Sequence, residues 1–241
     1  MTASLPLTPD AIAQAAAELA HKTPQEVLRW ALDTYGDRVS LASSFGAEDV
    51  VLIDMLAQIC PDARVFTLDT GRLPQETYEV IGAVQRKYPQ LRLAIHVPDR
   101  AQVEPMVQEK GINLFYDSVE NRKQCCYVRK VEPLNRALSG LAAWVTGLRR
   151  DQTTNRQTMA VVEWEQDRQM VKINPLIDWT YPQIWEYIRQ NYVPYNALHE
   201  RNYPSIGCAP CTRAIAEGED LRAGRWWWEQ SNQECGLHVR T

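Results

Sequence analysis

The 241-residue chain has no apolar run that approaches the roughly 18 residues of a membrane span. Its first ten residues contain neither a basic leader nor an apolar stretch of the kind that directs export. We therefore expect a cytoplasmic protein, whose six cysteines serve catalysis or metal binding rather than disulfides. The net charge of −4 argues against a general nucleic-acid binder.

Familiar nucleotide-binding motifs and signs of several domains are also missing. Neither GxxxxGK[ST] nor GxGxxG occurs, so an ordinary P-loop or dinucleotide fingerprint is excluded. No internal repeat, low-complexity tract or Ser/Gly-rich linker divides the chain. We predict one domain over 1–241, with N-terminal helices in 1–36, an α/β nucleotide-binding core in 37–192 and a C-terminal arm in 193–241.

What the chain does contain is an alternation of β-rich and helix-like segments. Residues 8–36 predict two helices with Asp10 and Thr23 as N-caps. Short β-rich runs follow, with helical patterns between them, and they begin near residues 38, 63, 91 and 142. Residues 159–179 predict two short strands and 180–191 a helix. This alternation predicts an α/β fold, a mostly parallel sheet with helices on both faces.

Three polar loops fall at the ends of predicted strands, where ligands bind in such folds. They read "SSFGAED" (43–49), "LDTGR" (68–72) and "GLRRDQ" (147–152). Small residues before a helix start suit a phosphate, although an ordinary strand-to-helix connection explains the first loop equally. The second loop suits a turn or a ligand contact. Their coincidence locates the site, and the candidates in the first two loops are Ser43, Ser44, Gly46, Asp69, Thr70 and Gly71.

Two pairs of cysteines point to a metal centre. Cys125 and Cys126 are adjacent, and Cys208 and Cys211 form "CAPC" about eighty residues later. Four thiolates suit zinc or an iron–sulfur cluster. Adjacent cysteines point in different directions, which favours the separate irons of a cluster. The alternative is that "CC" comprises two core thiols and "CAPC" a redox pair. Cys60 ends an apolar helix pattern and is interpreted as a core cysteine.

The remaining cysteine, Cys235, has six residues after it. A thiol so close to the end of the chain suggests a nucleophile on a mobile arm. Upstream, Arg222 and Arg225 would project from one face if this stretch were helical, either to hold an anion or as part of a solvated face. The adjacent Trp226–Trp228 would pin the arm to the body. The basic run 121–130, which contains Arg122 and Lys130, is either a solvated face or a means of stabilising thiolates.

Taken together, six segments resemble the assimilatory adenylyl-sulfate reductases, in a wider family that includes the phosphoadenylyl-sulfate reductases. They are "SFGAEDVVL", "LDTG", "KQCCYVRKVEPL", "GLRRDQ", "GCAPCTR" and "ECGLH". The similarity runs from about residue 40 to the end. It implies an adenine-nucleotide α-hydrolase-like (Rossmann-like) fold and one 4Fe-4S cluster per chain, held by Cys125, Cys126, Cys208 and Cys211.

The resemblance also implies a mechanism and a set of roles. Cys235 would attack the sulfur of adenylyl sulfate, and reduced thioredoxin would then release sulfite, in sulfate assimilation leading to cysteine. His238 would lie near the thiol. The residues implied to hold the substrate are Lys130, Arg222 and Arg225 at the sulfate and phosphate, and Ser43, Ser44, Gly46, Gly147, Arg149 and Arg156 at the nucleotide. Arg122 stands where some relatives have histidine, so a role assigned to that histidine does not transfer.

Several alternatives stay open at this stage. The 3′-phosphorylated substrate, or use of both substrates, is the nearest. An ATP pyrophosphatase is more remote, because "SSFGAED" lacks the Gly pair and final Ser of "SGGxDS". A zinc-stabilised binding module would leave Cys235 unexplained. With no thioredoxin-like domain of its own, the chain needs a reductant in trans, either thioredoxin or glutaredoxin. The sequence does not decide whether it forms a homo-oligomer.

Overall fold

The computed structural model describes residues 8–152 and 156–229. The chain forms two compact units, each assembled from separate stretches of sequence. The first unit comprises 1–66, 80–94 and 140–195, and the second comprises 67–79, 95–139 and 196–241. The division into an N-terminal, a core and an arm segment within one domain stays a prediction. In the described ranges, no helix is both long enough and apolar enough to span a bilayer.

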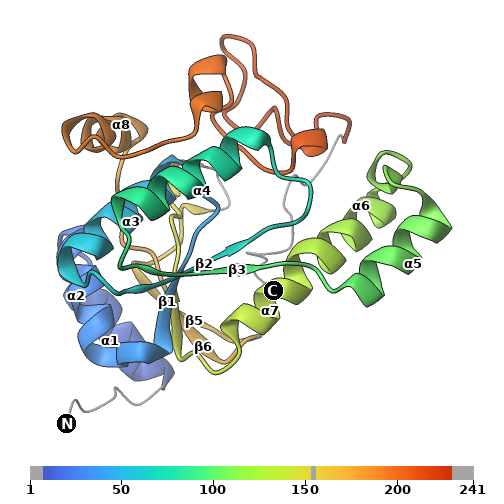
Figure 1. Ribbon diagram of the computed structural model, residues 1–241. Helices are drawn as coiled ribbons and strands as arrows, with labels where there is room; N and C mark the ends of the chain where they lie inside the picture. The colour runs from blue at the N-terminus through green and yellow to red at the C-terminus, as the bar shows by residue number, and fades with distance from the viewer. Residues whose placement is uncertain (1–7, 153–155, 230–241) are drawn as a thin grey trace. The chain divides into compact units, whose positions relative to one another are not determined.

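A six-stranded sheet runs through the fold in the order β3-β2-β1-β4-β6-β5 (Figure 1). Strand β1 pairs in parallel with β2 and β4, and β4 pairs in parallel with β6, while β5 runs antiparallel to β6. This confirms the predicted mostly parallel α/β sheet. The strands are β1 (Val39–Ala42), β2 (Arg64–Leu68), β3 (Arg92–His96), β4 (Ala143–Val145), β5 (Val162–Glu165) and β6 (Met170–Ile173).

Helices occur where the sequence predicts them, with one corrected cap, and two further helices lie in 100–126, where none was predicted. Thr23 caps the second helix in a capping box with Glu26, as the sequence predicts. The first helix is capped by Thr8, whose hydroxyl accepts from the Ala11 N–H, so the prediction of Asp10 was wrong. Asp10 lies in the first turn instead, where its charge suits the helix dipole. The helices are α1 (Pro9–Leu19), α2 (Pro24–Tyr35), α3 (Ala47–Ile59), α4 (Gln75–Lys87), α5 (Arg100–Lys110), α6 (Val119–Cys126), α7 (Glu132–Leu138) and α8 (Tyr181–Gln190).

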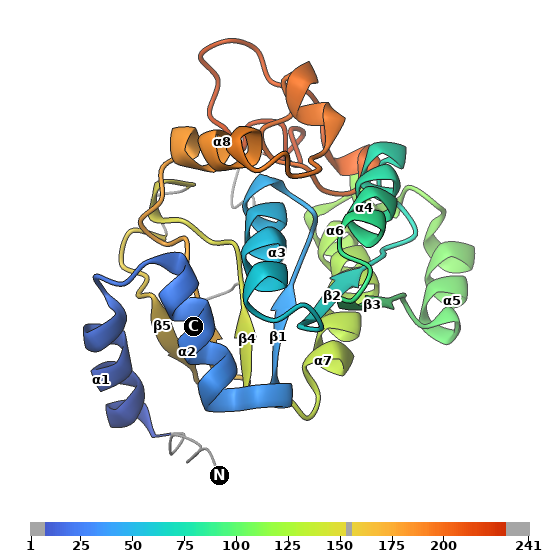
Figure 2. The ribbon, with the colours of Figure 1, turned by 60° about the vertical axis from the view of Figure 1, so that its left-hand side comes forward.

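The core of the first unit fixes where α3 begins. Val50, Val51, Leu52 and Ile53 follow one another along α3 and are all fully buried. Consecutive helical residues point in different directions, so α3 is enclosed on all sides. Helices α2 and α3 both contact β1 (Figure 2). The N-terminus of α3 is thereby held just beyond the end of β1, where the loop 43–46 lies.

A π-helical turn, Tyr127–Val131, joins α6 to α7 in the second unit. The Glu132 N–H donates to the Tyr127 carbonyl, five residues earlier. The sequence has an ordinary helical pattern over 127–140; the structure differs at its start because Pro133 has no N–H to continue the α-helical ladder. Short 3-10 turns occur at Gly36–Arg38, Leu114–Tyr116, Arg150–Gln152, Ala197–Arg201 and Ala209–Cys211.

Candidate functional site

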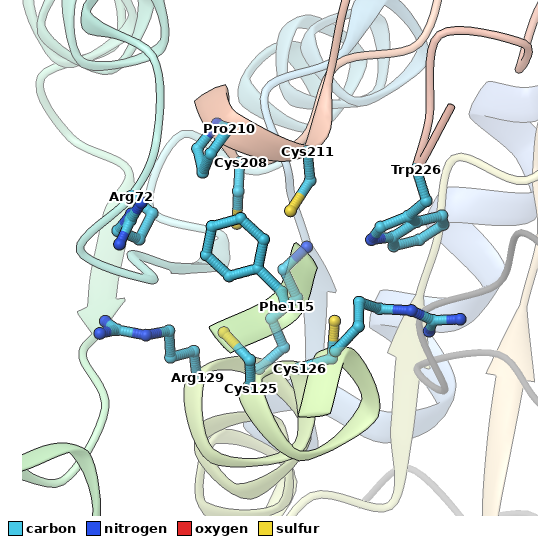
Figure 3. Close-up of a pocket in the computed structure, with 11 residues that line it drawn as sticks. Arg72, Phe115, Cys125, Cys126, Arg129, Cys208, Pro210, Cys211 and Trp226 are labelled. Atoms are coloured by element: carbon cyan, nitrogen blue, oxygen red, sulfur yellow. The ribbon is translucent and has the colours of Figure 1, made fainter. Parts of the chain in front are cut away.

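Four cysteine side chains line one cavity in the second unit (Figure 3). Cys125 and Cys126 end α6, while Cys208 precedes the 3-10 turn Ala209–Cys211 and Cys211 ends it. Each residue is between 7% and 9% exposed. Figure 3 shows the two pairs facing each other across the cavity. The structure therefore brings together the two pairs that are about eighty residues apart in sequence.

Thr212 organises the turn that carries Cys208 and Cys211. Its hydroxyl donates to the Cys208 carbonyl at 3.0 Å and accepts from the Gly207 N–H at 3.1 Å. The Cys211 N–H donates to the Cys208 carbonyl at 2.9 Å. Pro210 lies between the two cysteines and restricts the backbone of the turn. These bonds hold both thiols toward the cavity.

The "LDTG" loop lies beside the same cavity and contacts one of its thiols. The Thr70 hydroxyl lies 3.2 Å from the Cys208 sulfur, and the Thr70 carbonyl accepts from Arg129 at 2.8 Å. Gly71 has φ +68°, in the left-handed region that favours glycine. Its N–H donates to the Asp69 carboxylate at 2.8 Å. The substrate role of Asp69, Thr70 and Gly71 stays a prediction.

Cations around the cavity act differently on the individual thiols. Burial alone would raise the pKa of Cys208, but the charge of Lys130, a hydrogen bond from Thr70 and the charge of Arg225 together lower it. Burial and the neighbouring Cys208 raise the pKa of Cys211 to about 12. The pKa of Cys125 is raised by burial, which the charge of Arg129 opposes. Cys208, which Lys130 also hydrogen-bonds, is therefore disposed to be a thiolate.

The cavity suits a bound group with thiolate ligands and negative charge. Its donors are four thiols, with Lys130 and Arg129 beside them. The buried Trp226 indole N–H has no hydrogen-bond partner among the described residues, and in Figure 3 it lies on the side of the ring nearest the thiols. Such a donor would be satisfied by a sulfur acceptor inside the cavity. Within 8–152 and 156–229, no three His, Cys, Asp or Glu residues are grouped to hold a single metal ion.

Sequence reasoning missed three side chains that line the cavity: Arg72, Phe115 and Trp226. The Arg72 guanidinium lies over the Phe115 ring at 5.2 Å and donates to the Asn113 side chain at 2.8 Å. Arg72 directly follows "LDTG", so its place in that loop was an available signal. Phe115 and Trp226 belong to no recognisable motif.

Arg222 and Arg225 do not lie on a helix, so they do not share a helical face. Residues 221–228 lie mostly in turns, and the backbone of Arg225 forms an isolated antiparallel β-bridge with Thr212. Gly224 packs so closely that a Cβ there would lie 2.3 Å from the Arg213 carbonyl oxygen. This pairing with 212–213 prevents a helix. Arg225 is buried and donates to the Ser205 hydroxyl at 3.2 Å, while Arg222 lies in the preceding turn.

Two of the three tryptophans pin this segment, as expected. Trp226 is 1% exposed, and Trp228 packs on Tyr116 with ring centroids 4.6 Å apart. Trp227 is instead 41% exposed. Cys235 and His238 lie outside the described residues.

In the first unit, Asp49 organises the loop after β1. Its carboxylate accepts from the Ser44 N–H at 2.6 Å and from the Ser44 hydroxyl at 2.8 Å. The Ser43 hydroxyl accepts from the Phe45 N–H at 3.1 Å, and Gly46 is the N-cap of α3. Burial raises the pKa of Asp49 to about 6, although the bonds from Ser44 oppose this shift. The loop is thus shaped by hydrogen bonds within the protein.

Arg149 ties the loop after β4 to the same region. It is 1% exposed, donates to Glu48 at 2.9 Å and contacts Asp151. Glu48 also accepts from Gln152 at 3.0 Å, and the buried Arg156 donates to Gln152. The predicted nucleotide-site residues of the first unit are therefore gathered around the start of α3.

Gly147 is expected to be intolerant of any side chain. A Cβ there would lie 2.4 Å from the Asp49 carboxylate and 2.9 Å from the Glu48 Cβ. Gly147→Ala should displace the start of α3 and destabilise the fold by about 1–3 kcal/mol, the usual cost of overpacking. Thermal and urea unfolding measure the loss. Gly82→Ala in α4, which meets the flexible end of Arg86, is the matched control and should not destabilise. Equal stability of Gly147→Ala and Gly82→Ala would contradict the conclusion that Gly147 has no room for a side chain.

Comparison with known proteins gives consistent matches. Residues 38–214 match the sequence model of the phosphoadenosine phosphosulfate reductase domain family. The adenosine 5′-phosphosulfate reductase of Allochromatium vinosum is 51% identical over 205 residues, which are 85% of this chain and 80% of that protein. The corresponding protein of Staphylococcus haemolyticus is 45% identical over 220 residues, which are 91% of this chain and 88% of that protein.

Solved structures agree with the fold. A phosphoadenylyl-sulfate reductase from Candida auris, in a phosphate complex, has a TM-score of 0.76 at 32% identity. The match covers 88% of this chain and all of that one. The FMN adenylyltransferase of Candida glabrata has a TM-score of 0.56 at 14% identity, covering 90% of this chain and 73% of that one. This second likeness concerns the fold alone and is consistent with an adenine-nucleotide α-hydrolase-like architecture.

Proposed function

This chain belongs to the phosphoadenosine phosphosulfate reductase family, and on that premise we propose that it reduces adenylyl sulfate to sulfite and AMP. The substrate is supported by relatives at 45–51% identity that are named adenosine 5′-phosphosulfate reductases. The observation that carries the proposal is the cavity in which two distant thiol pairs meet beside Lys130. The reaction would serve assimilatory sulfate reduction leading to cysteine.

We propose that Cys125, Cys126, Cys208 and Cys211 hold one 4Fe-4S cluster. The all-thiol donor set, the cations and the inward-facing Trp226 N–H support this assignment. When bound, the cluster would supply fixed charge beside Lys130 and so tune the electrostatics of the site. Lys130 already hydrogen-bonds Cys208, so it would mediate between the thiol cavity and the substrate anion.

Cys235 is proposed as the nucleophile. Its thiolate attacks the sulfur of adenylyl sulfate, the bond from sulfur to the bridging oxygen breaks, and AMP leaves with that electron pair. The enzyme then carries S-sulfocysteine. A thiolate of reduced thioredoxin attacks the Cys235 sulfur, sulfite leaves, and a mixed disulfide forms. The second thioredoxin thiol resolves it, so the two electrons come from the thioredoxin dithiol. His238 is proposed to lie near the Cys235 thiol.

The proposed substrate contacts are of two kinds. Lys130, Arg222 and Arg225 supply positive charge for sulfate and phosphate oxygens. Arg225 already donates to Ser205 and Ile206, so its orientation is set by the protein. The residues proposed at the nucleotide are Ser43, Ser44, Gly46, Gly147, Arg149 and Arg156. A reducing cytoplasmic location is part of the same proposal, because free thiols persist there.

A reductase assay with metal analysis tests the proposal. Purified protein with adenylyl sulfate, thioredoxin and a thioredoxin-reducing system should release sulfite and contain iron rather than zinc. The 3′-phosphorylated analogue, assayed in parallel, determines specificity, and replacing thioredoxin by glutaredoxin determines the donor. Zinc in place of iron, with no sulfite from either substrate, would support the zinc-stabilised binding module instead.

A further inference from the structure

A buried ion pair joins the cysteine helix to the last described residue of the chain. Arg122 lies on α6, three residues before Cys125, and Glu229 immediately precedes 230–241. The Arg122 guanidinium donates two hydrogen bonds to the Glu229 carboxylate, one from Nε at 2.8 Å and one from Nη2 at 2.6 Å. Both side chains are 2% exposed. A bidentate ion pair that is shielded from solvent fixes the relative orientation of the two residues that form it.

Arg122 also contacts the two residues that connect this pair to the cavity. Its guanidinium lies over the Trp226 ring, 4.9 Å from the centroid. It hydrogen-bonds the Cys126 sulfur as well. One planar cation therefore touches a cavity thiol, an aromatic wall of the cavity and the carboxylate of Glu229.

The backbone at Trp226 is strained in a way that fits such an anchor. Trp226 has φ +44°, a conformation that bulky residues rarely adopt. Residues persist in such conformations where the surrounding contacts determine them. Here those contacts include Arg122 and Arg225, whose guanidinium lies 4.8 Å from the same ring. The chain thus turns at Trp226 and is held again at Glu229.

We propose that Arg122 is a positioning residue that anchors Trp226 and Glu229, which precede Cys235 in the C-terminal arm, to the helix carrying Cys125 and Cys126. Six peptide units separate Glu229 from Cys235, so the two Cα atoms are at most about 20 Å apart. A fixed Glu229 restricts the volume that the nucleophile can occupy and aligns it with bound substrate. This inference rests on the proposed function, because it assigns Cys235 as the nucleophile.

Two conservative variants test the anchor. Arg122→Lys keeps the charge but loses the planar fork and its stacking, and Glu229→Gln keeps the shape but removes the charge. Cys235 sulfonation is followed by rapid quench and mass spectrometry, with adenylyl sulfate in excess and no reductant. We expect the maximal rate to fall about tenfold to a hundredfold, as for a misplaced reacting group. The half-saturating substrate concentration and the iron content should stay at wild-type values. Hydrogen exchange in 222–229 should accelerate.

Arg213 and Glu219 offer a matched control in the same unit. They form a bidentate pair at 2.8 and 2.9 Å that is about one-third exposed and does not line the cavity. Glu219→Gln should leave the sulfonation rate and exchange in 222–229 unchanged. Wild-type rates in both Arg122→Lys and Glu229→Gln would overturn the anchor. The anchor would also be overturned if the sulfonation rate fell only in proportion to iron content, which indicates a structural role, or if the half-saturating substrate concentration rose instead, which indicates a role in substrate binding. Absence of any adduct in the wild type would overturn the proposed function itself.

Discussion

The Cys235→Ser variant is expected to release no measurable sulfite while keeping the colour and iron content of the wild type. A serine hydroxyl is scarcely ionised near neutral pH, whereas a thiol is partly thiolate and is the stronger nucleophile. Cys235 is not one of the four proposed cluster ligands, so the proposed metal centre should persist. Initial rates of sulfite release, visible absorbance and iron analysis measure the two properties separately.

Cys60→Ser is the matched control for this variant. Cys60 follows α3, packs against the core of the first unit and donates to Asp62 at 3.2 Å. It does not line the cavity, and burial raises the pKa of its thiol. Its replacement should therefore leave turnover close to wild type. Substantial sulfite release by Cys235→Ser, with Cys60→Ser equally active, would contradict the assignment of the nucleophile.

The Cys208→Ser variant is expected to lose iron and, with it, all sulfite release. Iron–sulfur clusters are held by soft thiolates, and a neutral hydroxyl is a poor substitute. Cys208 should show the largest effect because it is the thiol that Lys130 and Thr70 both hydrogen-bond. Without a thiolate, the buried Lys130 charge would also lose a neutralising partner, which lowers stability. Iron-to-protein ratio, visible absorbance and thermal unfolding report these losses.

The comparison of Cys208→Ser with Cys60→Ser separates a ligand role from general sensitivity to cysteine loss. The two substitutions are chemically identical, but of the two residues only Cys208 lines the thiol cavity. Full iron in Cys60→Ser and none in Cys208→Ser is the expected pattern. Retention of stoichiometric iron by Cys208→Ser would contradict the cluster assignment, and stoichiometric zinc in the wild type would favour the binding module.

The sequence predicted the features that depend on local pattern. Strands β1, β2, β3 and β4 and the hairpin β5–β6 lie where β-rich runs occur, and Thr23 caps α2 in the predicted way. These elements follow from propensity, periodicity and turn residues within a few positions. The meeting of "CC" with "CAPC" was also predictable, because a four-thiol site requires both pairs.

Features that depend on distant contacts were not predictable. Arg222 and Arg225 have helical spacing, but residues 224–225 pair with 212–213, and that long-range pairing excludes a helix. The π-helical turn has the residue pattern of an ordinary helix and is set by bonding around Pro133. Thr70 holds the "LDTG" loop beside the thiol cavity through contacts with Arg129 and Cys208, which are far away in the sequence. The pairing of Arg122 with Glu229, 107 positions later, is likewise a distant contact that no local pattern indicates.

The central claim is covalent catalysis by Cys235, and peptide mass spectrometry tests it most directly. Iron-loaded protein is mixed anaerobically with adenylyl sulfate, or separately with the 3′-phosphorylated analogue, in the absence of reductant. We expect one SO₃ adduct on the Cys235 peptide, formed faster with adenylyl sulfate and released as sulfite when reduced thioredoxin is added. Iron-loaded protein that forms no adduct with either substrate would contradict it.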